Sequence, residues 1–203
     1  MFLRWMLDGD EREGIMKDRM ALGTWLLLIL AVLSACQGEQ PASQVPPGTE
    51  VELTIESSAF EVEGTIPKRY TCDGEDVSPP LSWSEPPAGT QSLVLVCDDP
   101  DAPIGTWDHW VLFNIPAAVR SLPEGVAADE VIEGVGTHGT NSWRRLGYGG
   151  PCPPEGSVHR YYFKLYALDT TLALDSRADK QEVEKAMTGH ILAQGQLMAR
   201  YGR

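Results

Sequence analysis

The sequence is poor in the residues and motifs that mark several common protein classes. Only 16 of its 203 residues are Lys or Arg, against 29 Asp or Glu, which gives a formal net charge of −13. Binding to nucleic acid depends on basic side chains that neutralise phosphates, so this balance argues against a nucleic-acid partner. Neither a Walker-type phosphate loop nor a Gly-x-Ser-x-Gly motif occurs. The chain therefore lacks two frequent signatures of nucleotide-binding proteins and serine hydrolases.

Cysteine is scarce as well. The four cysteines form no Cys-x-x-Cys pair and no Cys/His cluster, which argues against a structural zinc site. Cys97 ends an apolar run and is expected to be a free, buried thiol. Cys72 and Cys152 both lie in loops rich in Gly and Pro. The sequence leaves open whether these two form a disulfide, because pairing depends on the distance between their Cα atoms.

Long apolar runs are also missing. Residues 20–35 hold about a dozen apolar residues, fewer than the roughly 20 that a membrane-spanning helix needs. This run follows Lys17 and Arg19 and ends in Leu-Ser-Ala-Cys36, which resembles the lipobox of bacterial lipoproteins. The resemblance implies that Cys36 becomes the lipidated N-terminus after cleavage. The alternative is an uncleaved membrane anchor with an incidental cysteine.

These features predict three segments. Residues 1–35 form a signal peptide, in which the acidic residues 1–15 suggest an over-extended start. Residues 36–50 combine the lipidated cysteine with a flexible tether rich in Pro and Gly, and residues 51–203 form the folded domain. Gln37 follows the cysteine where an inner-membrane lipoprotein carries Asp. We therefore expect an exported bacterial lipoprotein of the cell envelope, at the outer membrane or periplasmic face in a Gram-negative organism.

Short strand patterns dominate the folded part. Apolar and polar residues alternate in 51–57, and apolar or aromatic runs favour strands at 81–83, 92–97, 107–115 and 159–168. Apolar residues recur at helical spacing from Asp179 to Tyr201, and Glu182 completes a capping box with Asp179. The sequence therefore predicts a mainly β fold, an antiparallel β-sandwich with peripheral helices that include a C-terminal helix.

The first polar stretch that could support binding or catalysis is acidic and lies at the end of a predicted strand. Asp98, Asp99 and Asp101 fall within four residues, and their mutual repulsion calls for a counter-group. His109, on the next predicted strand, could supply it. The alternative is an exposed acidic turn.

The second polar stretch begins the predicted strand 159–168. A Pro/Gly loop at 149–156 leads to His159, and Tyr161 should point to the same face two residues later. Histidine and tyrosine can both donate hydrogen bonds to an anion. The alternative is an ordinary packed core histidine.

Together these stretches resemble the phosphatidylethanolamine-binding protein family, in its bacterial Raf-kinase-inhibitor-like branch. The resemblance covers residues 51–203 and is carried by five segments. They are YTCDGEDVSPPLSW (70–83), DDPDAP (98–103), GTWDHWVLFNIP (105–116), YGGPCPPEGSVHRYYFKLYALD (148–169) and GHILAQGQLMARY (189–201).

The resemblance implies a β-sandwich with a small anion pocket at one end. Residue by residue, the family's pocket falls on the positions Asp99, Asp101, His109, Pro153, His159 and Tyr161. Nearby carboxylates should raise the pKa of the histidines, so that imidazolium groups and the tyrosine hydroxyl grip a phosphate. Binding should then weaken as pH rises.

The expected function is that of a non-catalytic binding module. Its ligand would be small and anionic or phosphorylated, like a phosphoethanolamine headgroup, and the module would act as a regulator or inhibitor at the cell envelope. No cofactor or metal is expected, and the membrane would be reached through Cys36. Two alternatives stay open: a metal-dependent or acid–base hydrolase that uses Asp99, Asp101, His109 and His159, and an inhibitor of a secreted protease that acts through residues 121–150.

Residues 121–150 are expected to border the pocket mouth. Arg144 and Arg145 lie in this segment and could attract anions, although an exposed pair is the simpler expectation. His138 and His190 are expected to have structural roles only.

Overall fold

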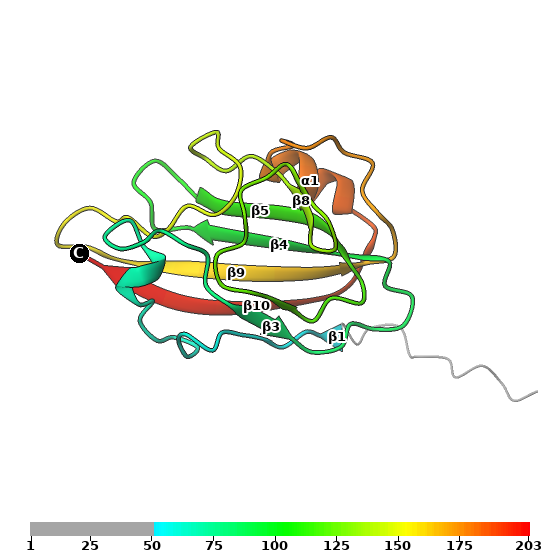
Figure 1. The fold of residues 1–203 in the computed structure, drawn as a ribbon, viewed down its shortest axis with the longest axis horizontal. Coiled ribbons are helices and arrows are strands. Elements are labelled where there is room, and N and C mark those ends of the chain that lie inside the picture. Colours follow the sequence, from blue (N-terminus) through cyan, green and yellow to red (C-terminus); the bar gives the residue numbers. More distant parts are fainter. Residues whose placement is uncertain (1–50) are drawn as a thin grey trace, which may run out of the picture. The chain divides into compact units, whose positions relative to one another are not determined.

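The computed structural model describes residues 51–203 and shows the predicted mainly β architecture (Figure 1). The predicted features that fall within residues 1–50, including Cys36 and the tether, lie outside the described residues. Within 51–203, no helix has the length and apolar character needed to cross a membrane. The elements in chain order are β1 (Val51–Glu52), β2 (Ile55–Glu56), the 3₁₀ turn η1 (Lys68–Tyr70), β3 (Leu81–Trp83), β4 (Ser92–Asp99), β5 (Trp107–Pro116), β6 (Ser121–Leu122), β7 (Val131–Ile132), β8 (Gly136–His138), β9 (Val158–Leu168), α1 (Lys180–Met187) and β10 (Ile191–Gly202).

The strands form two sheets. The larger has the order β1-β10-β9-β4-β5-β8-β7, and the smaller has the order β2-β3-β6. All neighbours run antiparallel except β1 and β10. The stretch 51–57, predicted as one strand, is divided between β1 in the larger sheet and β2 in the smaller one.

The central strand β4 is buried on both faces, as its continuous apolar run predicts. Leu93, Leu95 and Cys97 point into the core between the two sheets. Val94 and Val96 point the other way, into a second cluster that α1 covers. The sandwich core and the helix-covered face thus meet along this one strand.

The C-terminal helix is shorter than predicted. The capping box at Asp179 and Glu182 is present, but α1 ends at Met187 and the chain continues as β10. The prediction of helix through Tyr201 is therefore wrong for residues 191–201. Gly189 has a positive φ of 84° directly after the helix, which is the usual conformation where a helix stops.

Candidate functional site

The candidate site lies where three long strands of the larger sheet meet. The antiparallel pairing brings the end of β4 beside the starts of β5 and β9, at the end of the sheet that carries the C-terminus in Figure 1. A cavity of about 390 Å³ opens there, which we call the strand-end pocket. It is lined by Asp99, Ala102, Pro103, Ile104, Trp107, His109, Trp143, Cys152, Pro153, Pro154 and His159.

Asp99 and His159 form the polar centre of this pocket. Both side chains are buried, and His159 Nδ1 lies 2.7 Å from Asp99 Oδ2. Because a carboxylate accepts hydrogen bonds, Nδ1 carries the proton and Nε2 of the same ring is left for a ligand. The backbone N–H of Asp101 donates to the other Asp99 oxygen at 2.8 Å, which fixes the carboxylate orientation.

His109 reaches the pocket through an irregularity in β5. The pairing of β4 with β5 steps from Trp110 to Asp108 across Cys97 and Asp98, so His109 is an extra, bulged residue. A bulge changes the direction of a side chain relative to regular alternation, which brings His109 into the pocket lining beside Asp99. Its Nδ1 donates to the Gly149 carbonyl at 2.6 Å.

The expectation of a raised histidine pKa is wrong for His109. Burial lowers the pKa of its ring, and the Gly149 carbonyl and the charges of Asp99 and Asp98 oppose this shift only in part. With Nδ1 protonated, the neutral ring presents the lone pair of Nε2. The pocket therefore holds no ready-made imidazolium at this position near neutral pH.

Asp101 does not line the pocket. Its carboxylate forms a bidentate pair with the Arg160 guanidinium, at 2.6 Å and 2.9 Å, and also accepts from the Arg160 backbone N–H. These hydrogen bonds lower the pKa of Asp101 to about 2. The pairing anchors the acidic loop to β9. Asp101, although predicted as a ligand-binding residue, therefore makes a structural contact and does not line the pocket.

Tyr161 is buried next to the pocket residue His109. Its side chain is buried in the sandwich core, and its ring meets the His109 ring edge-to-face at 5.2 Å. Burial, together with the charge of Asp99, raises the pKa of its hydroxyl. That hydroxyl has no hydrogen-bond partner within the described part of the chain. Tyr161 is therefore not among the lining residues, although its ring packs against His109 and its hydroxyl lies near Asp99.

A Pro-rich loop closes one side of the pocket. Cys152, Pro153 and Pro154 line it, and Cys152 forms a disulfide with Cys72 at a Cα–Cα distance of 5.5 Å. The Cys72 backbone N–H also donates to Pro151 at 3.2 Å. The loop is thus tied to the segment that follows η1.

Two tryptophans also line the pocket, and neither was among the predicted site residues. Trp107 begins β5, and Trp143 comes from the loop between β8 and β9. Their rings meet edge-to-face at 5.3 Å. Both residues lie in segments that we expected to be near the pocket. The sequence could not show that their side chains line it, because that depends on the conformation of the loops.

The remaining histidines have structural contacts. His138 is buried, accepts a hydrogen bond from Trp110 Nε1 at 2.9 Å and uses Nδ1 to donate to the Asp129 carbonyl. His190 pairs with Asp169 at 2.8 Å on the exposed surface. Arg144 and Arg145 are exposed, and the Arg145 guanidinium lies 5.5 Å from the centre of the Trp143 ring.

A separate charged cluster lies on the other face of the larger sheet. Asp98 is buried, and its Oδ2 pairs with Lys164 at 2.8 Å and with Lys180 at 2.9 Å. Lys180 also reaches Asp108 at 3.2 Å. Burial opposes the charge on Lys180, but the hydrogen bond and the charge of Asp98 raise its pKa overall. Since Lys180 begins α1, this Asp98 cluster fastens the helix to the sheet.

The four residues considered as metal ligands do not converge. Asp99, His109 and His159 line the pocket, whereas Asp101 is paired with Arg160. Among residues 51–203, no group of three or more His, Cys, Asp or Glu side chains has an arrangement that could hold a metal ion. The structure thus gives no support to the proposed ligand set of a metal-dependent hydrolase.

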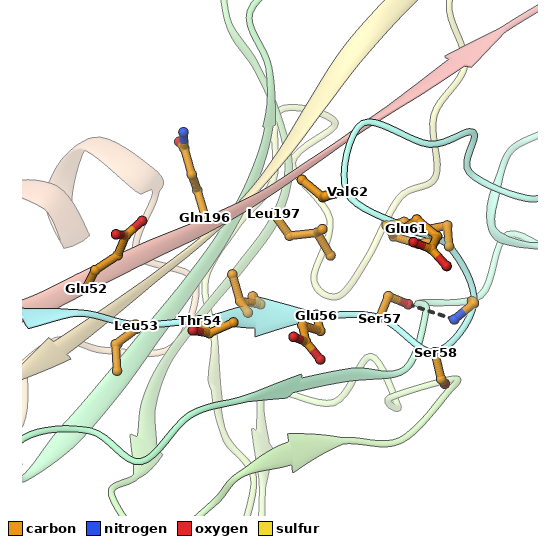
Figure 2. A pocket seen from close by; sticks show the side chains of 13 residues that line it. Glu52, Leu53, Thr54, Glu56, Ser57, Ser58, Glu61, Val62, Gln196 and Leu197 are labelled. Carbon is orange, nitrogen blue, oxygen red and sulfur yellow. Dashed lines mark hydrogen bonds between the residues drawn. The ribbon is translucent and has the colours of Figure 1, made fainter.

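A second hollow shares no lining residue with the strand-end pocket. Figure 2 shows this edge groove, where the segment containing β2 diverges from β10 and the loop after Ser57 closes the open end. Its volume is about 720 Å³, and it is lined by residues 52–62 together with Gln196 and Leu197. No histidine or basic side chain lines it, so it offers no counter-charge to an anion.

The fold and the pocket define a class of protein: a two-sheet β-sandwich with a small histidine–aspartate pocket at one end of its larger sheet. Comparison with known proteins gives this class its name. The family model described as "Phosphatidylethanolamine-binding protein" matches residues 56–202. The chain belongs to the phosphatidylethanolamine-binding protein family.

Individual relatives agree with this assignment. A UPF0098 protein of Methanothermobacter thermautotrophicus is 50% identical over 151 residues, which cover 74% of this chain and 99% of the relative. A putative family homologue from Chlamydia trachomatis, CT736, has a crystal structure that matches with a TM-score of 0.68 and 39% identity, over 75% of this chain and 98% of its own. YbcL of E. coli, described as a member of the mammalian family, matches with the same TM-score and 31% identity, over 75% and 99%.

Proposed function

We propose that the strand-end pocket binds the head of a small anionic or phosphorylated ligand, such as phosphoethanolamine, and that the protein is a binding module rather than an enzyme. Membership of the family supports a ligand-binding role in general. The observation that carries the specific proposal is the pair of buried histidines, each with Nδ1 engaged and Nε2 left for a ligand. Asp99 orients one of these rings and can accept a hydrogen bond from an ammonium group.

The lining offers no free thiol as a nucleophile. Cys152 is in a disulfide, and the one free cysteine among the described residues, Cys97, is buried in the core. Burial, together with the charges of Asp98 and Asp99, raises the pKa of the Cys97 thiol, so the thiolate is disfavoured. Covalent catalysis by a cysteine of the pocket therefore lacks a starting group.

Binding of the anion should be coupled to uptake of a proton. An anion favours the protonated form of His109, whose pKa is lowered in the free protein, so affinity rises as pH falls toward that pKa. For one proton taken up, the limit is about tenfold per pH unit. We expect phosphoethanolamine to bind at least about tenfold more weakly at pH 8 than at pH 5.5.

Calorimetric titration with phosphoethanolamine at pH 5.5 and pH 8, with and without zinc, measures this change in affinity. Weaker binding at pH 8 and no effect of zinc are expected. Equal or tighter binding at pH 8 would show that no histidine proton takes part, and binding that requires zinc would mean that the anion is held by a metal.

Acid–base hydrolysis is a second candidate, favoured by one observation. The Asp99–His159 hydrogen bond of 2.7 Å is the arrangement in which a carboxylate holds a histidine ready to accept a proton at Nε2. Incubation with p-nitrophenyl phosphate and p-nitrophenyl acetate tests it. The binding module predicts no turnover above that of a His159→Ala variant, and turnover lost in that variant would favour the hydrolase.

We further propose that the protein acts at the cell envelope as a lipoprotein anchored through Cys36. The apolar run and the Leu-Ser-Ala-Cys36 sequence support this proposal. In a bacterial host, Cys36→Ser should prevent incorporation of a labelled fatty acid and leave the precursor uncleaved. Labelling that persists in this variant would overturn it.

A further inference from the structure

The strand-end pocket has an apolar half that its aspartate and histidines do not explain. Seven of its eleven lining residues are apolar, whereas an inorganic anion offers no apolar surface to bury against them. Ile104 among them is 81% exposed at the mouth. The apolar members are Ala102, Pro103, Ile104, Trp107, Trp143, Pro153 and Pro154.

Trp143 is held in this lining by its own loop. Asn141 is buried, and its Oδ1 accepts hydrogen bonds from the backbone N–H groups of Trp143 and Arg145, both at 3.1 Å. Gly149 leaves room for the indole, since a Cβ at that position would lie 2.7 Å from Trp143 Cζ3. The ring is therefore positioned before any ligand arrives, which lowers the entropic cost of using it in binding.

The position of Trp143 links the polar and apolar halves. Its ring meets the His109 ring edge-to-face at 5.0 Å and the Trp107 ring at 5.3 Å. Arg145 lies over the same indole at 5.5 Å from the ring centre. A group attached to an anion held near His109 would thus come next to two indole rings.

Trp107 carries an unused hydrogen-bond donor. Its Nε1 is buried and has no partner among the described residues. A buried N–H without a partner is costly, and Trp107 is also one of the residues that line the pocket. The aromatic part of the lining therefore combines apolar contact with a donor that is closed to solvent in the free protein.

We propose that Trp143 is a specificity-determining residue and that, with Trp107, it selects ligands in which an aryl or alkyl group is attached directly to the anionic head. The chemical class is that of phosphate monoesters with an apolar substituent. This inference rests on the proposed function, because the anionic head must first bind beside Asp99, His109 and His159.

The probes for the test are phenyl phosphate and inorganic phosphate, titrated into the full-length protein at pH 5.5. Phenyl phosphate is expected to bind about tenfold more tightly, because its ring is buried against the indoles. Trp143→Ala and Trp143→Leu should both reduce this preference to about threefold or less while changing the affinity for inorganic phosphate less than about twofold. Leucine keeps much of the bulk and protects the conclusion from a folding defect in the alanine variant.

Ile191→Ala serves as the matched control. Ile191 is also a large exposed apolar residue, but it lies at the opposite end of β10 from the residue that pairs with His159. This variant should keep the full preference for phenyl phosphate.

Each outcome separates the two proposals. Equal affinity for the two probes would overturn the selection by Trp143 and leave anion binding intact. A preference that survives both Trp143 variants would likewise overturn the role of Trp143. If neither phenyl phosphate nor inorganic phosphate binds, the proposed function is overturned, and the inference falls with it.

Discussion

At the scale of single residues, two adjacent aspartates have different roles because successive side chains on a strand point to opposite faces. Asp99 points to the sandwich side and orients His159 in the pocket. Asp98 points to the helix-covered side, where it pairs with Lys164 and Lys180. The acidic cluster of the sequence therefore has two parts: Asp99 belongs to the pocket, and Asp98 is a structural anchor.

Lys180 tests the structural half of this division. In Lys180→Met, the buried Asp98 keeps only Lys164 as a partner, so we expect a loss of about 2 kcal/mol in the free energy of unfolding. Lys185→Met, on the exposed side of the same helix, should change it by less than about 0.5 kcal/mol. Urea denaturation measures both values. Equal losses in the two variants would mean that the Asp98 cluster does not fasten α1.

His109 shows what residue identity alone could not predict. The sequence places it near three carboxylates, and this favours a raised pKa. Burial outweighs those charges and lowers the pKa of His109, and this burial depends on the bulge in β5 and on the contact with Trp143. Neither feature can be recognised in the sequence, because the same residues would also fit a regular strand followed by an exposed loop.

At the scale of elements, the Pro-rich loop closes one side of the pocket without belonging to a helix or strand. Its disulfide joins Cys72 and Cys152 across 80 residues of sequence. Closing a loop of that length removes entropy from the unfolded chain worth about 4 kcal/mol. The bridge therefore contributes to the stability of the domain as well as to the pocket wall.

The double variant Cys72→Ser/Cys152→Ser should lose about 2–5 kcal/mol in the free energy of unfolding, measured by urea denaturation. Reductant should destabilise the natural chain by a similar amount and have no further effect on the double variant. A loss below about 1 kcal/mol would show that the two loops are held mainly by other contacts, such as the hydrogen bond from Cys72 to Pro151.

The predictions of individual elements succeeded where one signal dominated. The central strand was predicted well because its apolar run has a single interpretation at that length. The C-terminal segment satisfied helical and strand spacings at once. Ala193, Leu197, Ala199 and Tyr201 alternate as buried residues of β10, and Gly195 accommodates the close approach of the Leu53 backbone, a long-range contact that local spacing does not encode.

At the scale of the whole molecule, the pocket is assembled from segments that are 40 to 60 residues apart in sequence, as in the contacts of His109 with Gly149 and of Asp99 with His159. Motif content identified four of its lining residues, namely Asp99, His109, Pro153 and His159. It also included Asp101, which pairs with Arg160, and Tyr161, which packs against His109, and neither lines the cavity. Trp107 and Trp143 were missed because their place in the lining depends on the conformation of the loop between β8 and β9.

The central claim is that His159, oriented by Asp99, binds the anion in an otherwise acidic protein. The chain offers a matched control, because His190 makes the same type of pair with Asp169 on the exposed surface, at 2.8 Å compared with 2.7 Å in the pocket. The most direct measurement is calorimetric titration of phosphoethanolamine at pH 5.5 into the natural protein, His159→Ala and His190→Ala. The account predicts binding to the natural protein and to His190→Ala with equal affinity, and a loss of at least about 30-fold in His159→Ala. Binding that His159→Ala leaves unchanged would contradict it.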